Sequence, residues 1–311
     1  MTQGGSESDF QWLQNSKGDR PTLRWAVSTD SQLMSFDLSR ETGGTIAADS
    51  MGGLSHFDRR GNLVSINRGF DGVQDVRWSD NGNGGAILVG EDAIVKVRQS
   101  LALRWSVDLP SPVTAFDVDP YGNHIAVCMA NGKNRIYDWK KSRVTEFETI
   151  QPLSFIRFVA NEQRLVCSAE YGLLSCHNFD GDELWNEKLW TNVGDISIAG
   201  DGETILLAGF NHGVQVFDDD GTHRGSYMME GSPGLVSTSF IPERVAAATI
   251  EKHLYWLDSD GEMIWACSPD SEVIGLQTDA LGNGMLCGLA SGHILRLTWD
   301  DAADDDDDES L

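Results

Sequence analysis

The chain has 311 residues, of which 40% are hydrophobic and 33 are glycine, so it can form one large or two ordinary globular domains. Its formal net charge is −25; eight of these charges lie in the segment 300–309, which leaves −17 for the rest. This excess of acid excludes a surface for nucleic-acid phosphates and one for anionic lipid, so we expect neither a nucleic-acid partner nor membrane binding.

The cysteines indicate a reducing environment. Their number is odd, none forms a Cys-x-x-Cys pair, and most lie within apolar strand patterns. The N-terminal residues lack the basic and apolar regions of a signal peptide, and no apolar run approaches the roughly 18 residues of a membrane helix. We therefore expect a cytoplasmic protein. The five cysteines are Cys128, Cys167, Cys176, Cys267 and Cys287.

The N-terminal residues 1–21 predict a flexible arm. Residues 1–9 are polar and rich in glycine and serine, and a turn is expected at Lys17-Gly18-Asp19. Residues 10–14 (Phe-Gln-Trp-Leu-Gln) could form a strand within this arm. Residues 22–27 alternate between apolar and polar side chains and predict a strand.

From residue 32 onward a unit of 40 residues repeats. One series of apolar residues at this spacing is Phe36, Val76, Phe116, Ile156, Ile196, Val236 and Leu276. A second series is Phe57, Val97, Tyr137, His177, Phe217, Leu257 and Leu297. A third consists of tryptophans 80 residues apart, at Trp25, Trp105, Trp185 and Trp265. Chance does not align three independent series in this way.

Each unit contains four short strands separated by Gly-rich and Asp-rich turns, which is typical of a propeller blade. Because a single blade cannot bury both of its faces, neighbouring blades must cover them and the ring must close. The tryptophans of the third series suit wedging between blades. The fold class predicted is therefore all-β: one seven-bladed β-propeller of antiparallel blades over residues 22–299, with blade boundaries near 32, 72, 112, 152, 192, 232 and 272.

The last unit has only three predicted strands, and residues 22–27 match the missing fourth in type and register, since Trp25 lies 80 residues before Trp105. We therefore expect the N-terminal strand to complete the last blade. Residues 10–14 resemble a third strand and compete with residues 293–299 for that position. The segment 300–311 is predicted to be a disordered polyacidic tail.

Two features of the repeat resemble known propeller families. The turn and tryptophan in Leu257-Asp-Ser-Asp-Gly-Glu-Met-Ile-Trp265 resemble the repeat of quinoprotein-like (PQQ-like) propellers, and the 40-residue spacing with Trp299-Asp300 resembles WD-repeat propellers. The resemblance implies the β-propeller superfamily and says little about function. The chain lacks the adjacent cysteine pair of quinoprotein dehydrogenases, which usually have eight blades. Its only Gly-His, at Gly292-His293, opens a third strand rather than preceding a first strand as in WD repeats.

No residue cluster predicts catalysis, a metal or a cofactor. The acidic turns that begin at Asp218 and Asp258 have Met229 and Pro269 at the twelfth position, where an EF-hand loop needs glutamate. No histidines are paired at metal-ligand spacing, and there is no Gly-x-Ser-x-Gly or P-loop sequence. We therefore expect a protein without enzymatic activity and without a cofactor.

The connections between blades supply the candidates for a binding face. Residues 67–72 contain Arg68 and an expected exposed Phe70, residues 189–192 contain Trp190, and residues 227–230 contain Met228 and Met229. The turns between second and third strands open on the same face and place there His212, His253 and His293. The leading hypothesis is a monomeric scaffold that presents this loop face to a partner protein, which the sequence does not identify.

The alternative hypothesis is a propeller that binds a small molecule or sugar, including a hydrolase or a lyase, at its central channel. Its motivation is a pair of acids near the starts of first strands, Asp195 and Glu272, which are expected to face the channel.

Overall fold

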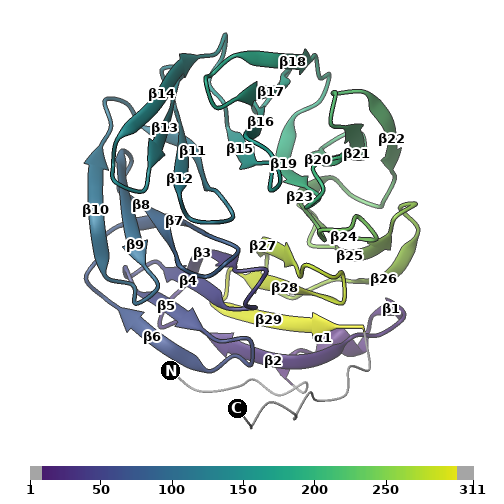
Figure 1. The fold of residues 1–311 in the computed structure, drawn as a ribbon. Helices are drawn as coiled ribbons and strands as arrows, with labels where there is room; N and C mark the ends of the chain where they lie inside the picture. Colours follow the sequence, from purple (N-terminus) through teal and green to yellow (C-terminus); the bar gives the residue numbers. More distant parts are fainter. Residues whose placement is uncertain (1–8, 300–311) are drawn as a thin grey trace, which may run out of the picture.

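Seven repeated units surround a central axis in the computed structural model, which describes residues 9–299 (Figure 1). Each unit forms an antiparallel sheet whose strands follow one another outward from the axis, and the first strands contain both buried and partly exposed residues. The second strands are almost wholly buried, because neighbouring blades cover both sides of each sheet. The predicted seven-bladed all-β propeller is confirmed.

The strands of each blade have the following bounds. The innermost strands are β3 (Leu33–Leu38), β7 (Val73–Trp78), β11 (Val113–Val118), β15 (Phe155–Phe158), β19 (Val193–Ile198), β23 (Pro233–Thr238) and β27 (Val273–Thr278). The second strands are β4 (Thr45–Asp49), β8 (Gly84–Val89), β12 (His124–Met129), β16 (Arg164–Ser168), β20 (Thr204–Gly209), β24 (Arg244–Thr249) and β28 (Gly284–Leu289). The third strands are β5 (Leu54–Phe57), β9 (Ala93–Arg98), β13 (Lys133–Asp138), β17 (Leu174–Asn178), β21 (Gly213–Asp218), β25 (Leu254–Asp258) and β29 (His293–Thr298). The outermost strands are β6 (Leu63–Asn67), β10 (Leu103–Asp108), β14 (Arg143–Glu148), β18 (Glu183–Glu187), β22 (His223–Tyr227), β26 (Met263–Cys267) and β2 (Thr22–Ser28).

The ring is closed by the N-terminal strand, as predicted. β2 pairs antiparallel with β29, with Trp25 opposite Arg296, so the last blade has the order β2-β29-β28-β27. β29 is thus the third strand of that blade, which resolves the ambiguity about the two termini. Closure pairs the outer edge of β29 and brings segments from the two ends of the chain side by side (Figure 1).

The residues before β2 differ from the expected arm and strand. Gln11–Gln14 form a short helix, α1, and Lys17–Gly18 form β1, which pairs with β26 as a fifth strand on blade 6. Trp12 and Leu13 are adjacent and both buried. A strand would point them to opposite faces, whereas a helical turn lets both pack onto blades 6 and 7. The predicted tail 300–311 lies outside the described residues, as do residues 1–8.

The periodic tryptophans wedge between blades. The indole Nε1 atoms of Trp25, Trp105 and Trp185 donate to backbone carbonyls of the next blade, at Arg59 (3.0 Å), Trp139 (3.0 Å) and Asp219 (2.6 Å). The ring of Trp185 covers Gly221, which has φ +85°, and a Cβ there would lie 2.7 Å from the ring. Glycine is therefore required in this turn both for its backbone conformation and for the close approach of the ring.

A cluster of tryptophans fills the region between blade 6, blade 7 and the N-terminal segment. Trp256 and Trp265 are fully buried, and the ring of Trp299 stacks on Trp256 at 4.6 Å and meets Trp265 edge-on. Trp299 also donates from Nε1 to the carbonyl of Asp19 at 2.7 Å. We call this region the seam.

Within residues 9–299, no helix has the length and apolar character needed to span a membrane.

Candidate functional site

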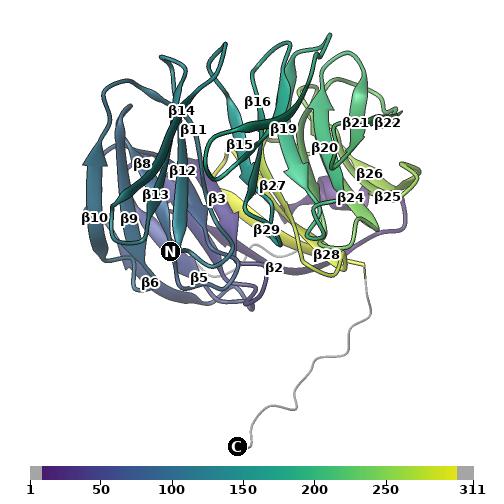
Figure 2. The same ribbon diagram turned by 45° about the horizontal axis from the view of Figure 1, so that its top comes forward.

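The strands run between two faces of the ring, seen obliquely in Figure 2. What we call the loop face contains the connections between blades (residues 29–32, 68–72, 109–112, 149–154, 188–192, 228–232 and 268–272) and the turns between second and third strands (50–53, 90–92, 130–132, 169–173, 210–212, 250–253 and 290–292). The remaining turns form the opposite face, the turn face. Antiparallel order within each blade makes this division strict for the described strands.

Large apolar side chains are exposed on the loop face of blades 4, 5 and 6. Trp190 is 71% exposed and Met228 is 72% exposed, although both belong to residue types that are usually covered. Three further exposed residues lie on the same part of this face. We call the set the apolar arc: Ile150, Tyr171, Trp190, Met228 and Ile250.

Side-chain and backbone contacts join the loops that carry the apolar arc. Gln151 donates from Nε2 to the carbonyl of Tyr171 at 3.1 Å, and Tyr171 forms a β-bridge with Asn192, two residues after Trp190. Gly194 and Gly234 touch where blades 5 and 6 meet, and Ile250 packs over Gly234. These contacts therefore link the three neighbouring blades that carry the arc.

The exposure of Trp190 follows from its neighbours. Leu189 is buried in the core between blades 4 and 5 and fixes the loop, so the next side chain points outward. The ammonium group of Lys188 lies 4.4 Å from the centre of the Trp190 ring, a cation–π contact that orders the exposed indole.

Of the predicted contact residues, Phe70 is buried and Met229 is partly buried. Phe70 was expected to be exposed, but it is buried, because it inserts into the core of blades 1 and 2 with Leu54 and Val73. Met229 packs partly into the core of blades 5 and 6, unlike Met228. Arg68 lies on the loop face, and its guanidinium pairs with Asp30 at 2.5 Å.

The three loop-face histidines lie in different surroundings. Nδ1 of His253 is 3.3 Å from the carbonyl of Glu230 and 3.4 Å from the hydroxyl of Tyr255, whereas the ring of His293 packs edge-on against Phe10. His212 is exposed in its turn. Among residues 9–299 no group of three or more His, Cys, Asp or Glu side chains is placed to hold a metal ion.

The central channel is lined by a ring of polar side chains that sequence reasoning missed. They lie 40 residues apart, directly after the first apolar series, at Asp37, Arg77, Asp117, Arg157, Ser197, Ser237 and Gln277. Four of them accept a hydrogen bond from a backbone N–H of the next blade: Asp37 from Trp78 (2.6 Å), Asp117 from Phe158 (2.8 Å), Ser197 from Thr238 (3.1 Å) and Ser237 from Thr278 (2.9 Å). These bonds tie four of the seven neighbouring pairs of first strands together.

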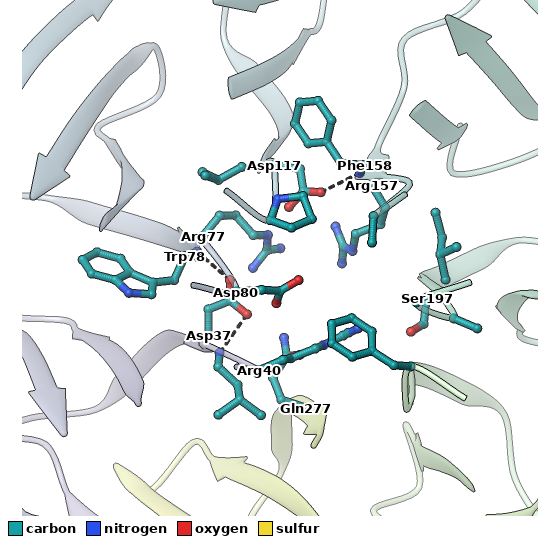
Figure 3. Close-up of a pocket in the computed structure, with 18 residues that line it drawn as sticks. Asp37, Arg40, Arg77, Trp78, Asp80, Asp117, Arg157, Phe158, Ser197 and Gln277 are labelled. Atoms are coloured by element: carbon teal, nitrogen blue, oxygen red, sulfur yellow. Dashed lines mark hydrogen bonds between the residues drawn. The ribbon is translucent and has the colours of Figure 1, made fainter. Parts of the chain in front are cut away.

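The two arginines of this ring point toward the centre of the channel (Figure 3). Arg77 pairs with Asp75 at 3.2 Å and Arg157 with Asp195 at 3.1 Å. Asp195 also accepts from the backbone N–H of Val236. The predicted channel acid Asp195 is thus committed to an ion pair, while Glu272 is exposed in the loop before β27.

Burial perturbs the channel carboxyl groups. It raises the pKa of Asp37 to about 6, against the opposing effect of Arg77, and it raises the pKa of Asp80 to about 6, against that of Arg40. The cavity that these side chains line has a volume of about 90 Å³. Pockets for drug-sized ligands measure about 300 Å³ or more, so this one has room for a few waters or a small ion.

The cysteines are all free and buried. Burial raises the pKa of the Cys176 thiol to about 11 and that of Cys287 to about 12, so these two thiols stay protonated at neutral pH.

Comparison with known proteins identifies the architecture and nothing finer. No family model and no curated protein matches the sequence. Many solved chains match the structure, among them the crystal structure of the β-propeller domain of Cps50 (Swd1) from Myceliophteria thermophila, with a TM-score of 0.77 and 14% identity over 89% of this chain and 99% of that one. At this identity the likeness shows the fold alone: the chain is a seven-bladed β-propeller.

Proposed function

We propose that this protein is a non-catalytic scaffold that binds a partner protein through its loop face, with the apolar arc as the contact. The observation that carries the proposal is the exposure of five large apolar side chains on loops of three adjacent blades. Contiguous apolar surface of this kind is uncommon on monomeric proteins and marks sites of association. Trp, Tyr and Met are also residue types enriched where interfaces bind most strongly.

The turn face offers a weaker alternative surface. Its exposed large apolar side chains are Tyr121 and Trp139 on blade 3, Ile241 on blade 6 and Leu281 on blade 7. They are fewer and are divided between two parts of the ring. The resemblance to WD-repeat propellers supports an interaction role as well, and the quinoprotein-like resemblance remains one of repeat pattern. The unpaired cysteines favour a cytoplasmic location.

Affinity purification from the source cells tests the proposal. The tagged full-length chain is compared with a Trp190→Ala, Met228→Ala variant and with Tyr121→Ala, a matched aromatic truncation on the turn face. We expect the wild type and Tyr121→Ala to retain the same partner and the loop-face variant to retain about tenfold less. Equal recovery by all three proteins would contradict the proposal.

The channel supports a second candidate function, the binding of a small ion or polar molecule. The observation in its favour is the convergence of Arg77 and Arg157 on a cavity of about 90 Å³. A thermal-shift screen of small metabolites tests it, because a ligand of the folded state raises apparent stability. Stabilisation that disappears in Arg157→Met would favour this function, and the absence of any shift would remove it.

A further inference from the structure

We propose that the apolar arc recognises a positively charged protein segment that carries apolar side chains, and that a cationic side chain of this segment enters a hollow between α1 and blade 6. The inference rests on the proposed function and specifies the chemistry of the partner. It is carried by the charges around the arc and by the shape and lining of the hollow.

The loop face is acidic. Its connections and turns contain nine carboxylates and three cationic side chains. Two of the cations are already engaged, Arg68 with Asp30 and Lys188 with the ring of Trp190. Complementarity therefore favours a basic partner and disfavours an acidic one. The nine carboxylates are Asp30, Asp71, Glu91, Asp92, Glu170, Glu230, Glu251, Asp270 and Glu272.

Carboxylates alternate with the apolar side chains along the arc itself. Glu170 precedes Tyr171, Glu251 follows Ile250, and Glu230 lies two residues after Met228. The backbone N–H of Ser232 donates to Glu251 at 2.8 Å, and this bond lowers the pKa of Glu251, which stays ionised at neutral pH. A segment with interspersed apolar and basic residues would match this alternation.

A hollow of about 310 Å³ lies beside the Glu230 end of the arc. Trp12 of the N-terminal helix and Tyr255 and His253 of blade 6 line it, together with Glu230 and Asp270. Lys17 also lines it, so the lining contains two carboxylates and one ammonium group. Aromatic rings with carboxylates nearby suit the flat guanidinium of an arginine or the ammonium of a lysine.

Selection from a library of short random peptides displayed on phage tests the inference. The full-length protein is the target, and a Tyr171→Ala, Trp190→Ala variant is used for counter-selection. We expect the enriched peptides to have positive net charge and to contain aromatic or aliphatic residues. Synthetic versions should bind the wild type at least about tenfold more tightly than this variant, and more weakly as salt is raised.

Charge variants test the electrostatic part separately. Glu230→Lys and Glu251→Lys should each weaken binding of the synthetic peptides, and Glu230→Lys should do so most for peptides that lose affinity when one arginine or lysine is replaced by alanine. Glu203→Lys, an exposed change on the turn face of blade 5, is the matched control and should leave affinity unchanged. Thermal melts of each variant establish that these surface changes leave the fold intact.

The outcomes separate this inference from the proposed function. Enriched peptides that are acidic or neutral, peptides that bind the Tyr171→Ala, Trp190→Ala variant equally well, or a failure to enrich any peptide would overturn the inference. The proposed function would survive those results if a natural partner is still lost from the Trp190→Ala, Met228→Ala protein in affinity purification.

Discussion

The seam and the apolar arc both concentrate large apolar side chains, but they use them in opposite ways. At the seam, Trp256 and Trp265 are fully buried and Trp299 stacks between them and the N-terminal segment. On the arc, Trp190 and Met228 remain largely exposed. The difference shows that the repeat determines where strands lie, whereas the presence of a covering neighbour determines whether an aromatic ring stabilises the fold or is free to bind.

Removing the covering segment is the severest way to test this contrast. Deletion of residues 1–28 removes α1, β1 and β2, uncovers the seam and leaves the edge of β29 unpaired. We expect the cooperative thermal transition to be lost and the protein to aggregate. A synthetic peptide of residues 9–28 added in trans should restore part of the transition. A truncated protein with an unchanged melting temperature would contradict the role of β2 in closure.

Truncation of one seam tryptophan should have the next largest effect. Trp265→Ala removes a fully buried ring and should lower the free energy of unfolding by about 3–5 kcal/mol. Trp185→Ala, at the equivalent strand position two blades earlier but partly exposed, should cost about half as much. Chemical denaturation measures both. Equal losses would mean that the seam is no more tightly packed than an ordinary blade boundary.

The turn beneath a wedging tryptophan gives a sharper test of packing. Gly221→Ala places a Cβ 2.7 Å from the Trp185 ring at φ +85°, and should cost about 1–3 kcal/mol. In a Trp185→Ala background the clash is gone and only the backbone strain remains, so the cost should fall to about 1 kcal/mol. A double-mutant cycle measures this coupling, and strictly additive losses would show that the ring does not depend on the glycine.

Asp37 in the channel should make the free energy of unfolding depend on pH in the opposite direction to a carboxyl group whose pKa is lowered by folding. Because burial raises the pKa of Asp37 from 3.8 to about 6, the folded state binds its proton more tightly than the unfolded state. Its stabilising contribution is complete below pH 4 and is lost as pH rises through about 6. Asp37→Asn does not titrate, so the wild type should gain about 1–2 kcal/mol relative to this variant between pH 7.5 and pH 4.5. A constant difference would show that Asp37 is already ionised throughout.

The smallest effect on stability is expected on the arc. Trp190→Ala should change the free energy of unfolding by less than about 0.5 kcal/mol, because most of the ring is already in water. A loss as large as that for Trp185→Ala would mean that Trp190 supports the fold, and the contrast with the seam would fail.

The architecture could be predicted closely from the sequence because each blade repeats the same register. The series that begins at Phe36 lies on first strands throughout, and Trp25 marked the closing strand. Residues 10–14 were harder, because a helical turn of four residues carries no periodicity and is stabilised here by contacts with blades 6 and 7. The polar residues that line the channel directly follow the members of the Phe36 series in the sequence. Comparing the residue after each member of that series across the blades would have revealed them.

The candidate site was predicted only in part, because exposure of a loop residue depends on what covers it. Phe70 and Trp190 both lie in connections between blades, yet Phe70 enters a core and Trp190 does not. Tyr171 and Ile250 were missed. The sequence of a turn between two strands does not show whether an apolar side chain stays in solvent or packs against the blade. The sequence does distinguish Ile250, because most other blades have a small or acidic residue at the equivalent position of the repeat.

The pairing of β2 with β29 also constrains how the protein is made. Arg24 on β2 bonds to Thr298 on β29 across 274 residues of sequence, so the ring cannot close until β29 has left the ribosome. Six blades can form earlier, but β2 must wait until β29 has been made. Contacts so distant in sequence form slowly, and until they form the partial ring presents open edges to other chains. Slow synthesis of the C-terminal blade should therefore prolong exposure of the N-terminal strand to aggregation and to chaperones.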